Sequence, residues 1–239
     1  MSATGTTPPG AADEEQAARW VRGMFGRIAP RYDLLNHLLS FNRDRAWRRR
    51  TLERLGPALA RPGARALDLC CGTGDLALEL KQSPAWVVAS DFCHPMLTVA
   101  GAKGCQRLFE ADALTLPLAA GSFDVVTVAF GFRNFANYRR GLDEMRRILR
   151  PGGTLAILEF TTPPNALFRV GYNFYSRHML PKLGGLLTGS PEAYTYLPES
   201  VRKFPGAVEL AASLRAAGFA EVEFEYLTFG VVALHLGRG

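Results

Sequence analysis

The chain has 239 residues, of which 48% are hydrophobic and 21% charged, and this composition suits one α/β domain with an ordinary core. The formal net charge of +6 favours an anionic partner, but no basic run is interleaved with aromatic residues, so we expect no nucleic-acid partner. Four cysteines without a C-x-x-C pair, and four histidines, predict reduced thiols in a cytoplasmic protein and no metal site.

The N-terminal part divides into a tail and a helical extension. Residues 1–13 are small and polar, which predicts a disordered tail without a secretory signal. Residues 14–239 are expected to form a single domain that begins with helices over 14–59, broken near Pro30. The arginines between Arg43 and Arg50 indicate either a solvated helix face or a contact with anionic lipid. No apolar stretch reaches the roughly 18 residues of a membrane span, so any membrane contact is peripheral.

From residue 64 the pattern changes to alternating strands and helices. Strands are predicted over 64–70, 86–91, 107–111, 123–130 and 154–160, and helices over 75–81, 95–102 and 138–149. Such alternation predicts a doubly wound, Rossmann-like α/β fold with a parallel sheet. After a helix over 207–217, the last strands, 221–229 and 231–237, meet at Gly230 and are predicted to form an antiparallel hairpin. A parallel sheet that ends in such a hairpin resembles the class I S-adenosylmethionine-dependent methyltransferases.

An aromatic segment interrupts this pattern over about 163–205. It is too long for a plain connection, so we interpret it as a helical insertion that covers a substrate. Its aromatic side chains are candidates for lining an apolar channel, with ordinary core packing as the alternative; they are Phe168, Tyr172, Phe174 and Tyr175.

The turn after the first strand is the most informative segment. Gly72 and Gly74 lie between the strand and the next helix, where glycine lets a ligand approach the backbone. With Ala77 the spacing is also that of a dinucleotide fingerprint, and Asp91 follows at the distance of a ribose acceptor. The motif alone therefore leaves a nicotinamide cofactor and S-adenosylmethionine open.

Charge favours S-adenosylmethionine. Asp75 would repel a pyrophosphate at the helix N-terminus, although it could also be only the helix N-cap. Three acids follow three successive strands, which suits a nucleoside that carries a sulfonium and an ammonium. Asp68 would help to hold the ammonium end and Asp91 would accept the ribose hydroxyls. Asp112 and Ala113 would contact the adenine.

Longer motifs resemble one family, the ubiquinone/menaquinone biosynthesis C-methyltransferases, over about residues 20–237. These motifs are Tyr32-Asp33-Leu34-Leu35-Asn36, Gly131-Phe132-Arg133-Asn134, the segment 147–159 and the segment 194–201. Leu35 stands where the family usually has Met, and Asp44 where it usually has His, which puts a catalytic role for that His in doubt. The resemblance implies cofactor contacts at Thr73, Asp91, Asp112 and Ala113.

The family reaction is C-methylation of a demethylated polyprenyl quinol with S-adenosyl-L-methionine. We expect demethylmenaquinol as the substrate, with the benzoquinol of ubiquinone biosynthesis as the alternative. Arg133 could stabilise the phenolate and, with Asn134, orient a water that takes the proton, while Tyr32 binds the second oxygen.

Other interpretations stay open. Arg133 could instead pair with a carboxylate, and Tyr32 could pack as core. His37 and His178 are candidate bases or structural residues. The alternative functions are a methyltransferase that acts on another phenol or a sterol, a nicotinamide-dependent oxidoreductase and a non-catalytic nucleotide-binding scaffold. We further expect peripheral contact with the inner face of the cell membrane and consider a homo-oligomer.

Overall fold

The structure is a computed structural model that describes residues 5–175 and 191–239, with the backbone alone for residues 35, 39, 173 and 191–195. The described residues form a seven-stranded sheet in the order β3-β2-β1-β4-β5-β7-β6. Its parallel strands are β1 (Arg65–Leu69), β2 (Trp86–Asp91), β3 (Leu108–Glu110), β4 (Phe123–Ala129) and β5 (Leu149–Phe160). The last two strands, β6 (Glu221–Leu227) and β7 (Val232–Arg238), pair antiparallel, as predicted.

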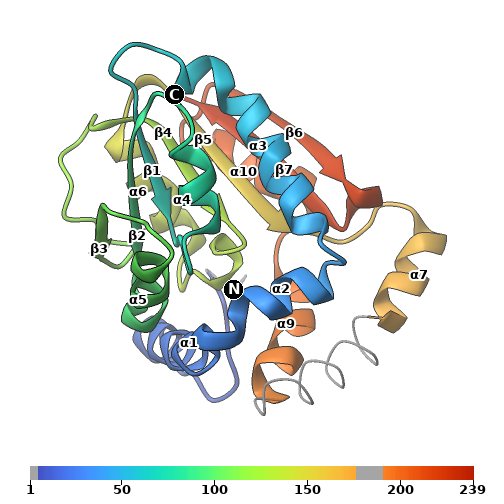
Figure 1. Ribbon diagram of the computed structural model, residues 1–239. Helices are drawn as coiled ribbons and strands as arrows, with labels where there is room; N and C mark the ends of the chain where they lie inside the picture. The colour runs from blue at the N-terminus through green and yellow to red at the C-terminus, as the bar shows by residue number, and fades with distance from the viewer. Residues whose placement is uncertain (1–4, 176–190) are drawn as a thin grey trace.

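Helices cover both faces of the sheet (Figure 1). On one face, α3 (Arg43–Leu59) and α4 (Asp75–Leu80) pack on apolar residues that include Ala66 and Val125. On the other, α6 (Tyr138–Ile148) and α10 (Ala207–Ala216) pack on residues that include Leu67 and Val126. Because side chains alternate along a strand, the apolar residues of β4 pack into both layers. Packing of helices on both faces holds the sheet in place, including the edge at which the candidate site lies.

Most element boundaries differ from the prediction by no more than two residues, and two parts of the chain differ more. Strand β5 begins at Leu149 rather than Thr154, because Phe123 pairs with Leu149 before the register shifts to pair Val125 with Thr154. The helical extension breaks twice, giving α1 (Glu14–Ile28), the 3-10 helix η1 (Ala29–Arg31), α2 (Tyr32–Leu39) and then α3. The second break falls at Phe41 and Asn42, whose φ angles of 53° and 58° are left-handed and end α2.

The remaining elements are α5 (His94–Ala102), the 3-10 helices η2 (Phe132–Asn134) and η4 (Thr228–Gly230), and the helices α7 (Ala166–Phe174) and α9 (Pro191–Lys203) of the predicted insertion. Of the tail predicted to be disordered, the structure describes residues 5–13. There Thr6 is buried, and its hydroxyl bonds with that of Tyr196 at 2.7 Å. In the part of the chain that is described, no helix is both long and apolar enough to cross a membrane.

Candidate active site

The turn between β1 and α4 forms the floor of a cleft where the strand order reverses, between β1 and β4. Gly72 (φ 54°) lines the cleft, and a Cβ there would meet only the ring of Tyr32, at 3.7 Å. Gly74 (φ 83°) serves packing instead, because a Cβ would lie 2.5 Å from the Cys105 sulfur. Gly74 is also the N-cap of α4, so the alternative role of Asp75 as N-cap is wrong.

Two buried carboxylates lie beside this turn, Asp68 one residue before the end of β1 and Asp91 at the end of β2. The oxygens of Asp91 accept from the backbone N–H groups of Gly72 (2.9 Å) and Cys93 (2.8 Å), and burial raises its pKa to about 6. Asp68 Oδ1 accepts from the Thr127 hydroxyl at 2.7 Å, and Oδ2 has no hydrogen-bond partner among the described residues. Burial raises the pKa of Asp68 to about 7. An unsatisfied buried carboxylate oxygen next to a second acid fits a ligand that carries positive charge.

Of the other predicted cofactor residues, some line the cleft and the others lie behind its lining. Asp112 and Ala113 line the cleft with Gly72 and Asp91, and Asp112 Oδ1 accepts from the N–H of Leu114 at 2.9 Å. Asp68, Thr73 and Gly74 are not among the lining residues, and the buried Thr73 donates its hydroxyl hydrogen bond to Asp33 on α2.

A second, larger cavity of about 440 Å³ adjoins the cleft. Its lining is mostly apolar and includes Trp47, Phe130 and Phe160. Of the aromatic residues predicted for a channel, Phe168, Tyr172 and Tyr175 line this cavity, whereas Phe174 is exposed and lies outside the lining. Phe25, Tyr32 and Phe130 line both cavities, so these rings mark the boundary between them.

The three predicted catalytic residues meet at this boundary. Arg133 lines the larger cavity, Asn134 lines the cleft, and Tyr32 lines both. Arg133 is buried and pairs with Glu159 at 2.9 Å. The predicted alternative, that Arg133 pairs with a carboxylate, is therefore confirmed, and Arg133 still lines the cavity. Burial raises the pKa of Tyr32, which keeps the phenol neutral and able to donate. Asn134 Oδ1 accepts from Tyr196 at 3.0 Å.

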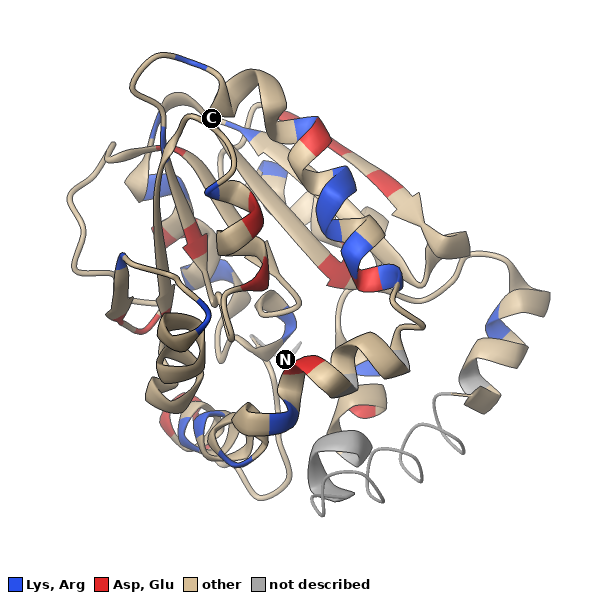
Figure 2. Ribbon diagram, in the orientation of Figure 1, with Lys and Arg blue, Asp and Glu red and all other residues tan. Residues whose placement is uncertain are grey.

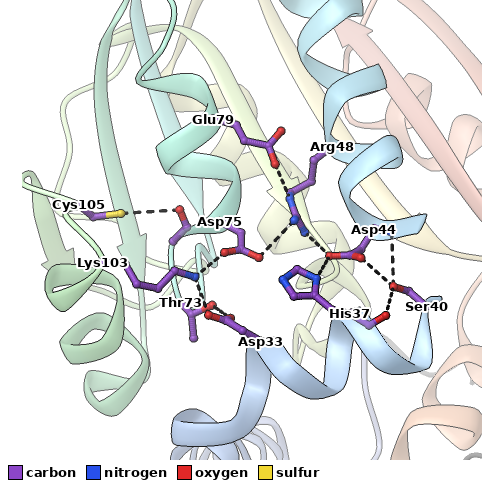
Figure 3. Close-up of polar contacts among 11 residues, drawn as sticks. Asp33, His37, Ser40, Asp44, Arg48, Thr73, Asp75, Glu79, Lys103 and Cys105 are labelled. Atoms are coloured by element: carbon purple, nitrogen blue, oxygen red, sulfur yellow. Dashed lines mark hydrogen bonds and ion pairs between the residues drawn. The ribbon is translucent and has the colours of Figure 1, made fainter. Parts of the chain in front are cut away.

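An ion-pair network fastens α2 and α3 to the cofactor turn (Figure 3). Lys103 bridges Asp33 on α2 and Asp75 on α4, and Asp33 also accepts from Thr73 in the turn. Arg48 on α3 then reaches Asp75 at 3.3 Å and Asp44 at 2.9 Å. Because Asp75 is paired with two cations, it repels an anionic ligand less than a lone carboxylate would.

His37 belongs to the same network, with Nδ1 2.7 Å from Asp44. An imidazole is thus retained beside the position where the resembling family usually has His. Ligand atoms of His37, Asp44 and Asp75 lie within 4.8 Å of one another, a spacing that a metal ion could use. The Arg48 guanidinium bonds to both acids, however, and supplies the positive charge there. His178, the other candidate base, lies outside the described residues.

Comparison with known proteins decides the family. The ubiE/COQ5 methyltransferase family model matches residues 11–238. The chain belongs to the ubiE/COQ5 methyltransferase family. A protein of Thermus thermophilus named demethylmenaquinone methyltransferase is 53% identical over 90% of this chain and 99% of its own. A Deinococcus radiodurans protein of the same name is 47% identical over 98% of both chains.

Similar solved structures support the fold of this ubiE/COQ5 family member. A methyltransferase from Thermotoga maritima, described as S-adenosylmethionine-dependent, has a TM-score of 0.67 at 19% identity, covering 90% of this chain and 98% of its own. The [4+2]-cyclase SpnF reaches 0.63 at 17% identity over 98% of both chains. A cyclase in this set shows that the fold alone does not determine the reaction. Membership of the ubiE/COQ5 methyltransferase family gives the reaction class. It confirms the predicted fold, enzyme class and methyl donor, and it excludes the nicotinamide alternative.

Sequence reasoning missed the partners that hold this ubiE/COQ5 site in place. Glu159 lies 26 residues from Arg133 in sequence, and Asp33 lies 40 residues from Thr73. Phe130, at the boundary of both cavities, has a left-handed φ of 58°. Asp33 and Glu159 lie within the quoted motifs, which was the available signal, but their partners depend on strand register and helix docking.

The raised pKa values predict a pH dependence of cofactor binding. A cationic ligand binds best to ionised carboxylates, so affinity for S-adenosylmethionine is full only well above pH 7 and falls as the pH drops through the pKa values of Asp68, about 7, and Asp91, about 6. Each group can contribute up to about tenfold per pH unit below its pKa. Calorimetric titration between about pH 7.5 and about pH 5.5 measures this, and Asp91→Asn should keep only the Asp68 component. Equal affinity throughout would contradict the assignment.

Proposed function

We propose that this enzyme transfers a methyl group from S-adenosylmethionine to a ring carbon of demethylmenaquinol. The observation that carries the proposal is the apolar cavity of about 440 Å³, which meets the cofactor cleft at Tyr32 and Phe130. A polyprenyl quinol needs such an apolar space next to the methyl donor. The names of the relatives at 53% and 47% identity support the naphthoquinol over the benzoquinol.

The residues at the boundary supply what the chemistry requires. A quinol ring carbon becomes a good nucleophile when a hydroxyl loses its proton, and that pKa is near 10, as for the phenol of tyrosine. The buried Arg133 guanidinium provides positive charge for the phenolate, and Glu159 holds it in place through two contacts, one from the side chain and one from the backbone N–H. The cofactor, when bound in the cleft, supplies the methyl group.

The remaining groups orient the ring and remove the proton. The neutral phenol of Tyr32 can donate a hydrogen bond to the second quinol oxygen. Asn134, held by Tyr196 at 3.0 Å, can orient a water that accepts the proton. Holding the ring between Tyr32 and Arg133 brings the reacting carbon toward the cleft, and positioning of this kind contributes much of the rate.

Peripheral membrane contact is part of this proposal, because the substrate tail partitions into a bilayer. The arginines between Arg43 and Arg50 do not act as one group. Arg48 pairs with Glu79 and Arg50 with Glu225, each bond measuring 2.8–2.9 Å. Arg43, Arg45 and Arg49 are exposed. These three support an attraction to anionic lipid, worth on the order of 1 kcal/mol for each residue close to the surface.

The substrate assignment is tested with purified enzyme and short-chain quinols that dissolve in water. Demethylmenaquinol with a short tail should be methylated on carbon, and the corresponding demethylated benzoquinol should react much more slowly. Quinone extraction from a strain that lacks the enzyme should show accumulated demethylmenaquinone. Methylation of the benzoquinol alone, with no accumulation of demethylmenaquinone, would refute the proposal.

A further inference from the structure

Three exposed apolar segments border the larger cavity: the end of α2, helix α7 and the turn η4, which together we term the apolar rim. Phe41 after α2 is 74% exposed, Leu167 on α7 is 85% exposed and Phe229 in η4 is 77% exposed. Helix α7 joins the other two segments, because Tyr175, which follows it, lies 5.9 Å from the Phe41 ring and Phe168 lies 5.2 Å from the Phe229 ring. Contiguous apolar surface of this kind marks a site of contact with another molecule.

The backbone at both tips of the apolar rim is unusual. Phe41 and Phe229 have φ angles of 53° and 55°, a left-handed conformation that bulky residues seldom adopt. Each tip is nevertheless anchored, since the N–H of Asn42 donates to the carbonyl of His37 at 2.7 Å and the Trp47 indole donates to Thr228 at 2.8 Å. Strained conformations that are held in place concentrate at functional positions. Both phenylalanines with this left-handed backbone are largely exposed.

The charge around the apolar rim is positive. The segments 34–43 and 161–175 contain no Asp or Glu, and each contains one arginine, Arg43 or Arg169. Figure 2 shows basic but no acidic colour on α7. The neighbouring acids Asp33 and Asp44 are paired with Lys103 and Arg48. Apolar tips with basic surroundings complement an anionic lipid surface, whose headgroups pair with the cations while the acyl region accepts the rings.

The apolar rim also belongs to the cavity, because Phe41, Phe168 and Thr228 contribute to its lining. We propose that the apolar rim docks on the surface of an anionic lipid bilayer, with Phe41 and Phe229 inserted at the headgroup level. This inference rests on the proposed function. Docking in this way places the cavity against the bilayer, so that a polyprenyl tail enters the protein without crossing water.

Vesicle co-sedimentation tests the docking, with the double variant Leu167→Ser/Phe229→Ser. Neither residue lines the cavity, so the substrate site is left intact. The matched control is Val208→Ser, which changes a 66% exposed apolar residue on α10. Wild type and control should partition equally onto vesicles of phosphatidylglycerol and phosphatidylcholine. We expect the double variant to partition roughly tenfold or more weakly, as the loss of two inserted apolar side chains implies. Phe41→Ser should weaken binding in the same direction.

Activity separates this inference from the proposed function. The double variant should methylate a soluble short-chain quinol at the wild-type rate, and be slower only on long-chain quinol embedded in vesicles. Failure of the wild type to methylate the soluble quinol refutes the function, whatever the vesicles show. Equal pelleting of double variant and control, or no pelleting of the wild type, refutes the docking. A wild-type dimer in solution that the double variant abolishes would assign the apolar rim to a second copy of the chain and overturn the inference.

Discussion

Replacing Arg133 with alanine is expected to lower the rate of methyl transfer by on the order of 10²-fold, the usual scale for one charge-stabilising group. Affinity for S-adenosylmethionine should hardly change, because Arg133 lines the quinol cavity and not the cofactor cleft. Single-turnover methylation of a short-chain demethylmenaquinol, beside calorimetric titration of the cofactor, measures the two quantities separately.

The buried pair complicates this variant, because removing Arg133 leaves the Glu159 carboxylate buried without its cation. Breaking such a pair costs about 3–5 kcal/mol in stability, so lost activity could reflect unfolding. The double variant Arg133→Gln/Glu159→Gln removes both charges and relieves that cost. If Arg133 acts on the substrate, the double variant stays slow although it folds. Recovery of the wild-type rate would instead make the pair structural.

A control for general effects of losing an arginine is Arg150→Ala. Arg150 pairs with Asp124 at 2.9 Å near the starts of β5 and β4, at the sheet edge opposite the site. Its loss should leave both the methylation rate and the affinity for the cofactor unchanged.

Replacing Asp91 with alanine is expected to weaken S-adenosylmethionine binding by roughly 1.5–3 kcal/mol, or about ten- to a hundredfold. Two losses combine in this variant. The predicted charged hydrogen bonds from the cofactor ribose to Asp91 are lost, and the N–H groups of Gly72 and Cys93, which donate to Asp91 at 2.9 and 2.8 Å, lose their acceptor. Calorimetric titration with S-adenosylmethionine measures the change.

Two further variants make the Asp91 experiment specific. Asp91→Asn keeps the size of the side chain and one acceptor oxygen, so it should preserve the turn and weaken binding less than alanine. Glu110→Gln changes a neighbouring acid at the end of β3, which pairs with Arg22 and His94 and is not among the residues that line the cleft. Unchanged affinity in Asp91→Ala, or an equal loss in Glu110→Gln, would remove Asp91 from the cofactor site.

The sequence predicted most of the sheet, because its strands carry their own signal. The strands β2 and β4 are mostly apolar, and the predicted bounds, 86–91 and 123–130, match the observed elements to within one residue. The early start of β5 could not be predicted, since it depends on the pairing of Phe123 with Leu149. Nor could the break at Phe41, because phenylalanine has no preference for the left-handed conformation found there.

For the candidate site, the sequence indicated which residues matter, but not which of them line the cofactor cleft and which line the larger cavity. Position after a strand placed Asp91, Asp112 and Arg133 at one sheet edge. The division into cleft and cavity depends on α2, which Asp33 helps to hold in place by meeting Thr73 and Lys103. Contacts between residues 40 and 70 positions apart have no local signature, so Tyr32 could be named from the family motif but not placed by physical argument.

The boundary formed by Tyr32 and Phe130 has a consequence for inhibitor design. Both rings line the cofactor cleft on one side and the quinol cavity on the other, so the two ligands are separated by little more than these side chains. A single compound that joins a nucleoside to an apolar aromatic group would need only a short linker to occupy both spaces. Joining two weak binders in this way raises the affinity through effective concentration. Since many methyltransferases share the nucleoside half, selectivity for this enzyme would come from the apolar half.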